Sequence, residues 1–158
     1  MVEPQTDRET DMSNGDEYED SMVHSEAIEE EDDARYPGSA ELHSIGAPLA
    51  RHLGLTRIGI HHERFLPGLR TSFPHAESTE EEFVLVLEGT PDVWLDGHLH
   101  RLSPGMSVGF PAGSGIAHSF LNSTDAEVRL LVVGEASKPE NRIVYPLNPE
   151  QKPCRNDW

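Results

Sequence analysis

Short apolar runs separated by Gly, Pro, Asn and Asp make up most of the chain from Leu53 onward. This pattern is typical of an all-β sandwich or barrel, because the runs have strand length and turn residues bound them. One short helix is predicted over residues 40–51. Strands are predicted over residues 55–66, 69–73, 82–88, 91–95, 98–102, 107–110, 116–122 and 127–134.

Two features of this pattern predict how the strands are connected and covered. Asp96-Gly97 lies between two strands and predicts a two-residue hairpin, since glycine accepts the positive φ that such a turn needs. The run 83–87 is apolar at every position, so both of its faces should be covered. We expect a second subunit of a homodimer to cover the outer face; the alternative is the chain's own N-terminal strand.

Acidic residues are concentrated at the N-terminus. Residues 1–36 hold 14 Asp and Glu against 2 Arg, whereas the other 122 residues hold 15 acidic and 10 basic groups, within a total net charge of −17. Such a segment buries too little apolar surface to offset the entropy of ordering, so it is predicted to be a disordered acidic tail. The expected organisation is a tail over 1–36, one β-barrel domain over 37–150 and a C-terminal tail over 151–158.

The same composition excludes several classes of partner. No Lys or Arg cluster is present, which argues against nucleic acids and anionic membranes. The N-terminus has neither the basic nor the apolar region of a signal peptide, and no apolar stretch reaches the length of a membrane span. The single cysteine, Cys154, forms no internal disulfide. We therefore expect a cytoplasmic protein.

Four residues suggest a metal site: His75, Glu77, Glu82 and His118. Residues two apart on a strand share a face, so His75 and Glu77 can point toward one ion. Glu82 begins the next strand, and His118 lies in a later one. Imidazole and carboxylate groups that converge in a barrel suit Fe, Mn, Ni or Zn, with open positions for water or substrate.

Two motifs with consistent spacing resemble those of the cupin superfamily. The first is carried by Gly68, His75, Glu82 and Gly89, and the second by Gly105, Pro111, Gly113, His118 and Asn122; the gap before His118 is two residues longer than usual. The resemblance implies a cupin jelly roll, that is, a double-stranded β-helix barrel. It also implies that His75, Glu82 and His118 bind one divalent transition metal ion.

Glu77 stands where most metal-binding cupins have a second histidine. It can ligate, which gives two His and two carboxylates and favours Fe or Mn. It can instead turn away, which leaves a facial set of two His and one carboxylate. The third alternative is a site that no longer binds metal, in a fold kept for binding. Glu77 is also the candidate catalytic base when it does not ligate.

The resemblance implies little about the reaction, because cupins include many enzyme classes and non-catalytic binders. The first hypothesis is a metal-dependent enzyme of oxygenase, isomerase or lyase type that acts on a small organic molecule. The alternatives are a small-molecule-binding or sensory cupin without turnover, and a scaffold whose acidic tail recruits a partner. Tyr145 and Arg129 are weaker candidates for substrate contacts. Arg129 would grip a co-substrate carboxylate if the protein were a 2-oxoglutarate-dependent oxygenase.

Other titratable residues lack such a pattern. Glu80 and Glu81 are expected on a solvated loop, although a shift of one residue would exchange Glu81 for Glu82 as ligand. The remaining histidines of the strands, His61, His62, His98 and His100, have no comparable partner pattern. His98 and His100 share a strand face and could line the mouth of the barrel, but we expect them at the surface or in the dimer interface.

Overall fold

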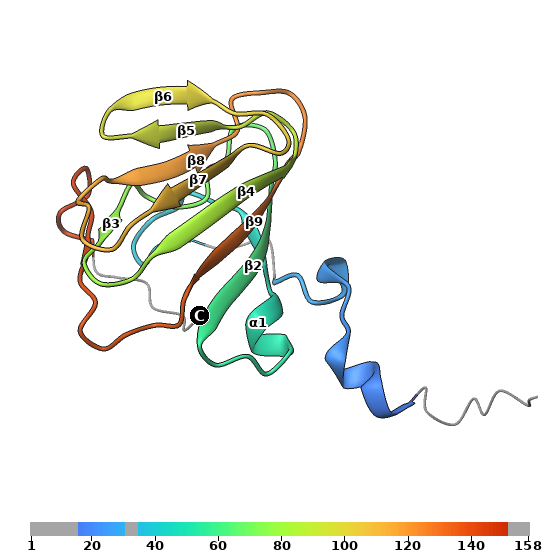
Figure 1. The fold of residues 1–158 in the computed structure, drawn as a ribbon. Coiled ribbons are helices and arrows are strands. Elements are labelled where there is room, and N and C mark those ends of the chain that lie inside the picture. Colours follow the sequence, from blue (N-terminus) through green and yellow to red (C-terminus); the bar gives the residue numbers. More distant parts are fainter. Residues whose placement is uncertain (1–15, 31–34, 152–158) are drawn as a thin grey trace, which may run out of the picture.

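Strands form nearly all of the regular structure in this computed structural model, which describes residues 16–30 and 35–151 (Figure 1). One sheet has five strands in the order β1 (Ile45–Pro48), β2 (Ile58–Phe65), β9 (Val128–Glu135), β4 (Glu82–Glu88) and β7 (Ser107–Phe110). The other has the order β6 (His98–Arg101), β5 (Asp92–Leu95) and β8 (His118–Leu121). A pair of two-residue strands, β3 (Ala76–Glu77) and β10 (Ile143–Val144), lies at one end. All of these strand pairs are antiparallel, and the all-β jelly roll is confirmed.

Alternation of side chains along the strands builds the core between the two sheets. In β9, Val128, Leu130 and Val132 are buried, and the residues between them face outward. Their inward-facing partners on β4 are Val84 and Val86. Both faces of β9 nevertheless carry apolar residues, which explains why its sequence does not alternate. The buried cluster is completed by Phe65, Val93, Leu102, Phe110 and Phe120.

The hairpin predicted at Asp96-Gly97 is present between β5 and β6. Both residues have positive φ, +45° and +98°. Asp96 is the only described residue other than glycine with positive φ. Its carboxylate accepts a hydrogen bond from the Ala117 backbone N–H at 2.9 Å, which ties the turn to the start of β8.

Two predicted elements are wrong. The helix over 40–51 is reduced to α1 (Leu49–His52), because the residues before it form β1 and pair with β2. Pairing along a sheet edge here outweighs a weak helical pattern. The strand over 69–73 is not formed: Arg70 makes only isolated bridges, to His43 and Leu121.

The outer face of β4 is open to solvent in this chain. Val84 and Val86 face the core, whereas Phe83 and Leu87 are 42% and 44% exposed. Their neighbours on β9, Leu131 and Val133, are partly buried and share this outer face. β1 lies at the edge of the sheet, separated from β4 by two strands, so it does not cover this face.

Part of the segment predicted as a disordered tail contacts the barrel. Residues 16–30 contain two 3₁₀ helices, η2 (Asp16–Ser21) and η3 (Ser25–Ala27), and the Glu30 N–H donates to the Gly46 carbonyl at 2.8 Å. Residues 1–15 and 31–34 of that segment, and 152–158 of the predicted C-terminal tail, lie outside the described residues.

Within the described residues, no helix is long and apolar enough to cross a membrane. Location in the cytoplasm stays a prediction.

Candidate metal centre

His75 and His118 lie side by side because their backbones pair. The His75 N–H donates to the His118 carbonyl at 3.1 Å, and the His118 N–H donates to the His75 carbonyl at 2.9 Å. Directly opposed residues of an antiparallel pair place their side chains on the same face. The two ring centroids are accordingly 4.8 Å apart.

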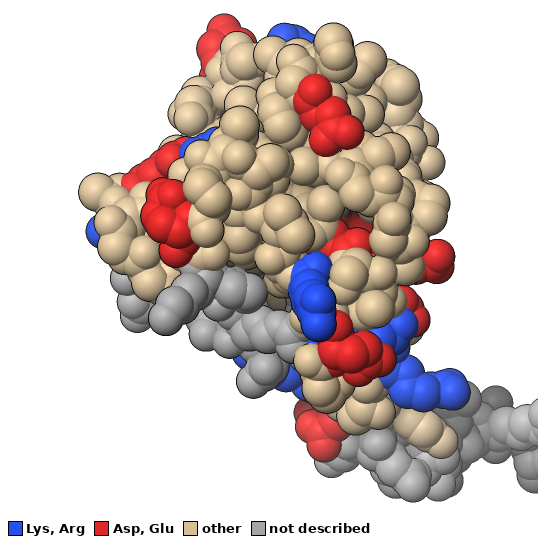
Figure 2. Space-filling view, turned by 90° about the vertical axis from the view of Figure 1, so that its left-hand side faces the viewer, with Lys and Arg blue, Asp and Glu red and all other residues tan. Residues whose placement is uncertain are grey.

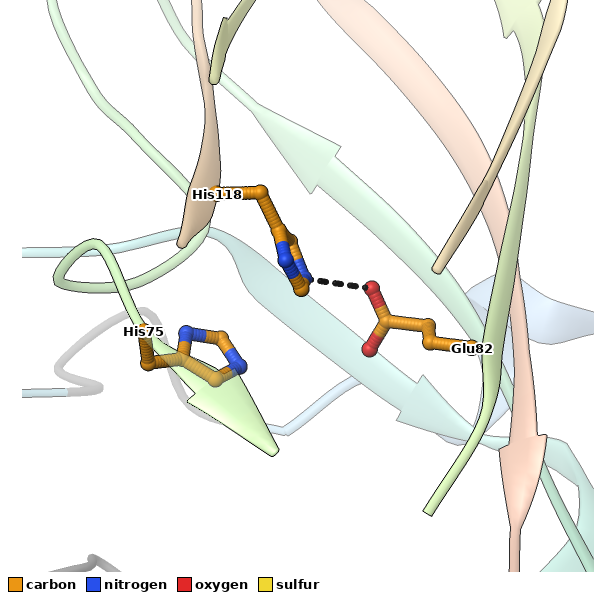
Figure 3. A group of neighbouring side chains, drawn as sticks. All are labelled: His75, Glu82 and His118. Carbon is orange, nitrogen blue, oxygen red and sulfur yellow. Dashed lines mark hydrogen bonds and ion pairs between the residues drawn. The ribbon is translucent and has the colours of Figure 1, made fainter. Parts of the chain in front are cut away.

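Glu82 reaches this pair from the opposite sheet. It begins β4, and its Oε1 lies 3.2 Å from His118 Nε2. Figure 3 shows the three side chains converging from three separate segments of the chain. One ligand atom from each of the three lies within 4.8 Å of the others. The structure thus brings together three of the four predicted ligands, and it places Glu82 rather than Glu81 at the site.

Neighbouring groups fix the orientation of both imidazoles. His75 Nδ1 is 2.9 Å from the Phe73 carbonyl oxygen, which can only accept, so Nδ1 carries the proton and Nε2 offers its lone pair. The His118 ring stacks on Phe110, with centroids 3.5 Å apart and planes 11° apart. Such contacts outside the ligand set hold metal-binding histidines in position.

The protonation states of His75 and Glu82 suit a cation. Burial lowers the pKa of His75, and the neighbouring His118 lowers it further, so the imidazole is neutral. Burial alone would raise the pKa of Glu82. The hydrogen bond from His118 acts against burial, and the net pKa of Glu82 is lowered. Neutral imidazole and ionised carboxylate are the forms that ligate metals.

The donor set fits a divalent transition metal ion. Two imidazoles and one carboxylate are the set that Fe, Mn, Ni and Zn accept with positions left open. The side chains of His118 and Glu82 are only 5% and 13% exposed, so the site is shielded without being closed. His75, Glu82 and His118 are therefore the residues that would hold the ion.

Glu77 lies outside this group of three. It is on β3, opposite Ile143 of β10, and its carbonyl accepts the Gly113 N–H at 3.1 Å. It is not among the described residues that line the pocket around the three ligands. Its roles as fourth ligand and as catalytic base stay predictions.

Glu80 differs from the expected solvated loop residue. It is 5% exposed, and its carboxylate accepts a short hydrogen bond from the Lys138 N–H. Glu80 therefore anchors the chain that follows β9, while Glu81 is exposed as expected.

A pocket of about 300 Å³ opens beside the three ligands. Figure 2 shows the molecule from the left-hand side of Figure 1. In this view, atoms of acidic residues are visible in a recess to the right of the centre. Tyr145 lines the pocket, and its role as a substrate contact stays a prediction. Sequence reasoning did not assign the other polar residues that line it, which are Glu30, Arg35, Tyr36, His43, Ser44, His61, Glu63, Thr71 and Ser72.

Arg129 does not line this pocket. It lies on the outer face of the five-stranded sheet, where it pairs with Glu127 at 2.9 Å and Glu26 at 3.0 Å. This position removes the basis for a 2-oxoglutarate site that uses Arg129.

Residues 61–134 match the cupin domain family. These residues form a cupin domain. It is similar to a cupin sugar phosphate isomerase from Silicibacter pomeroyi, with 34% identity, a TM-score of 0.63 and 66% of each chain covered. A candidate sugar phosphate isomerase from Acidithiobacillus ferrooxidans has 30% identity, a TM-score of 0.62 and 65% of each chain covered. The chain thus covers just under two thirds of the length of both.

Cupins of lower identity share the fold alone. The polyketide cyclase RemF from Streptomyces resistomycificus has 24% identity and a TM-score of 0.63, with 81% of this chain and 87% of that chain covered. A comparison with curated proteins finds no match.

Two residues of the cupin motifs have structural roles here. The Asn122 amide donates to the carbonyls of Phe65 and Ala126 at 3.1 and 2.7 Å, and its oxygen accepts from Thr124. A Cβ on Gly89 would lie 2.7 Å from the Glu127 carbonyl oxygen. Both residues close loops of the barrel and stay away from the metal centre.

Proposed function

We propose that this cupin is a metal-dependent isomerase that acts on a small sugar phosphate. The observation that carries the proposal is the convergence of His75, Glu82 and His118 beside a pocket of about 300 Å³. The three residues would hold one divalent ion, with Fe or Mn favoured. When bound, such an ion supplies a Lewis acid that polarises a substrate oxygen.

The comparisons support the class of substrate. Two solved structures that are at least 30% identical to this chain are described as sugar phosphate isomerases, one of them as a candidate. The pocket also has suitable chemistry. Arg35 is the one Lys or Arg among the described lining residues and offers a partner for a phosphate, while Tyr36, Ser44 and Thr71 can hydrogen-bond hydroxyl groups. The volume suits a small organic molecule.

Metal analysis of the purified protein tests the centre. We expect one ion per chain in the wild type and less than a tenth of that in His75→Ala and His118→Ala, because each removes one of three ligands. Glu77→Gln is the matched comparison from the neighbouring strand. Since Glu77 lies outside the group of three, we expect this variant to keep its metal; loss equal to that of His75→Ala would make Glu77 a ligand.

Turnover separates an enzyme from a binding protein. The metal-loaded protein is incubated with fructose 6-phosphate and ribulose 5-phosphate, and the products are identified by NMR. Interconversion of aldose and ketose that is lost in His118→Ala supports the proposal. Binding of these compounds without turnover would favour the alternative, a non-catalytic small-molecule-binding cupin.

We also propose that the protein is a homodimer whose interface includes the outer face of β4. Phe83 and Leu87 are exposed there next to Leu131 and Val133 of β9, and a contiguous apolar face favours association. We expect Phe83→Glu to give a monomer in sedimentation velocity with an unchanged circular dichroism spectrum. Leu99→Glu is the control, because Leu99 is 59% exposed in the other sheet; a dimer that survives Phe83→Glu would contradict the proposed interface.

A further inference from the structure

A second polar cluster lines the pocket, around a glycine of β1. Gly46 lies directly opposite Glu63 of β2. A Cβ on Gly46 would lie 3.4 Å from Glu63 Oε1, 3.8 Å from Glu30 Oε2 and 3.9 Å from His61 Nδ1. Because glycine has no side chain, three polar groups gather in this space at the wall of the pocket.

Glu63 is held in place without a cationic partner. The Ser44 hydroxyl donates a hydrogen bond to its carboxyl group, and His61 Nδ1 lies 3.9 Å from its Oε1. Among the ion pairs of the described residues, none joins Glu63 to Lys or Arg, whereas the partly buried Glu29 and Asp92 each pair with an arginine. Glu63 therefore does not serve the barrel as half of a structural ion pair.

The carboxyl group of Glu63 is sheltered but remains open to the pocket. Its side chain is 18% exposed, and it lines the same pocket as His75, Glu82 and His118. Glu63 reaches the pocket because side chains alternate along a strand, and residues 61, 63 and 65 of β2 all point inward.

The surroundings of Glu63 tune it for proton exchange near neutral pH. Burial raises its pKa to about 7, and the negative charges of Glu82 and Glu30 act in the same direction, while the Ser44 hydrogen bond opposes them. A group with a pKa near the working pH can both take and return a proton. Glu82, in contrast, has a lowered pKa and stays ionised.

We propose that Glu63 is the catalytic acid–base residue of this cupin, with Ser44 and His61 as residues that position it. The inference rests on the proposed isomerase function and deepens it. The substrate class is a hydroxy-carbonyl compound that is held between the wall formed by Glu63 and the one formed by His75, Glu82 and His118.

The proposed step balances without an oxidant or a reductant. The Glu63 carboxylate takes the proton from the hydroxyl-bearing carbon next to the carbonyl group. The electron pair of that C–H bond forms the double bond of an enediolate, and the former carbonyl oxygen takes the negative charge. The hydroxyl proton then passes to this oxygen, and Glu63 returns its proton to the neighbouring carbon, which completes the exchange of aldose and ketose.

Deuterium exchange tests this step. Wild type, Glu63→Gln, Glu63→Asp and Glu88→Gln are loaded with metal and incubated in D₂O with fructose 6-phosphate and ribulose 5-phosphate. Deuterium next to the carbonyl group is measured by mass spectrometry. We expect Glu63→Gln to slow exchange at least ~100-fold at an unchanged metal content, because acid–base residues contribute about that much. Glu88→Gln, whose side chain is 72% exposed, should match the wild type.

A second measurement does not depend on turnover. In metal-free protein with ¹³C-labelled glutamate, we expect one carboxyl resonance to titrate near pH 7 and to be absent from Glu63→Gln. Ser44→Ala removes a hydrogen bond that favours the carboxylate, so the midpoint should move to higher pH. A purely structural role for Ser44 would leave the midpoint unchanged and would overturn its assignment.

The outcomes distinguish the two proposals. If Glu63→Gln exchanges deuterium at the wild-type rate, the role of Glu63 is overturned and the isomerase proposal stands. If the wild type with one metal ion per chain exchanges no deuterium into either sugar phosphate, the isomerase proposal is overturned and the role of Glu63 falls with it. Should Glu63→Gln fail to fold, Glu63→Asp keeps the charge but withdraws it from the substrate, and unchanged exchange there would also contradict the role.

Discussion

Glu63 and Glu82 share one pocket, yet their pKa values are displaced in opposite directions. Burial raises the pKa of both carboxyl groups. At Glu82 a hydrogen bond from an imidazole opposes burial and the net pKa is lowered, whereas Glu63 receives a hydrogen bond only from a neutral hydroxyl group, and the charges of two other carboxylates raise its pKa further. A pair of carboxyl groups with separated pKa values can divide the roles of ligand and proton carrier. Glu63 and Glu82 have identical side chains, so the difference between their pKa values comes from the groups that surround each carboxyl group.

The raised pKa of Glu63 predicts a pH-dependent cost to stability. Its pKa of about 7 lies above the ordinary value of 4.5, so the folded state binds this proton more tightly than the unfolded chain. The stabilising contribution is fully present below pH 4.5 and is lost as the pH rises through 7. In metal-free protein, Glu63→Gln should therefore gain stability over the wild type, by about 3 kcal/mol between pH 4.5 and 8.

Urea unfolding with a chelator, at pH 5 and at pH 8, measures this difference. Glu88→Gln is the control, since it replaces an exposed carboxylate and should follow the wild type at both pH values. Parallel stability curves for wild type and Glu63→Gln would contradict the raised pKa.

At the scale of the elements, the tight turn after β4 requires glycine at position 89. Gly89 has a φ of +80°, and an added Cβ would lie 2.7 Å from the Glu127 backbone oxygen and 2.8 Å from Val128 Cγ2. The backbone would have to move, so Gly89→Ala should lower the free energy of unfolding by at least ~3 kcal/mol.

Gly105→Ala is the matched control for this turn. Gly105 has a similar φ of +87°, but nothing lies within 4 Å of its Cβ position. Only the conformational strain remains, about 1 kcal/mol. Equal losses for the two variants in urea unfolding would show that φ alone, and not the contact, makes glycine necessary at position 89.

Most strands were predictable because turn residues bound them and valine or leucine fills them. The ends predicted for 82–88 and 107–110 agree with β4 and β7. The strand over 45–48 was not predictable, since it exists only through its pairing with β2. The short strands 76–77 and 143–144 likewise depend on each other, across a long separation in the sequence.

The candidate metal centre was predictable to the extent that motifs define it. His75, Glu82 and His118 stand at spacings that a single sequence displays. His61 and Glu63 do not, because nothing in the sequence shows which face of the strand 58–65 points inward. Alternation with the buried Phe65 is a signal that could have identified them.

At the scale of the whole molecule, the acidic segment 16–30 is bound to the barrel by ion pairs. Glu29 pairs with Arg64 at 2.8 Å, Glu26 with Arg129 at 3.0 Å and Glu30 with Arg51 at 2.9 Å. Charges of both signs lie side by side in the lower right part of Figure 2. Because Glu30 also lines the pocket, this attachment joins the N-terminal segment to the site.

Loss of these pairs should loosen the segment without unfolding the barrel. In Arg64→Gln, we expect faster amide hydrogen exchange over residues 16–30, and a change in global stability below ~1 kcal/mol. High salt should have a similar effect on the wild type, since it screens exposed pairs. Arg101→Gln, which breaks a pair in the other sheet, should leave exchange in 16–30 unchanged; faster exchange there would contradict the assignment.

The buried side chain of Asn122 has a consequence for production of the protein in secretory hosts. Asn122-Ser123-Thr124 is an acceptor sequence for N-linked glycans. In the folded barrel Asn122 is 1% exposed and its amide nitrogen already donates two hydrogen bonds. A glycosyltransferase could therefore reach this nitrogen only before folding, and the attached sugar would then prevent the loop between β8 and β9 from closing.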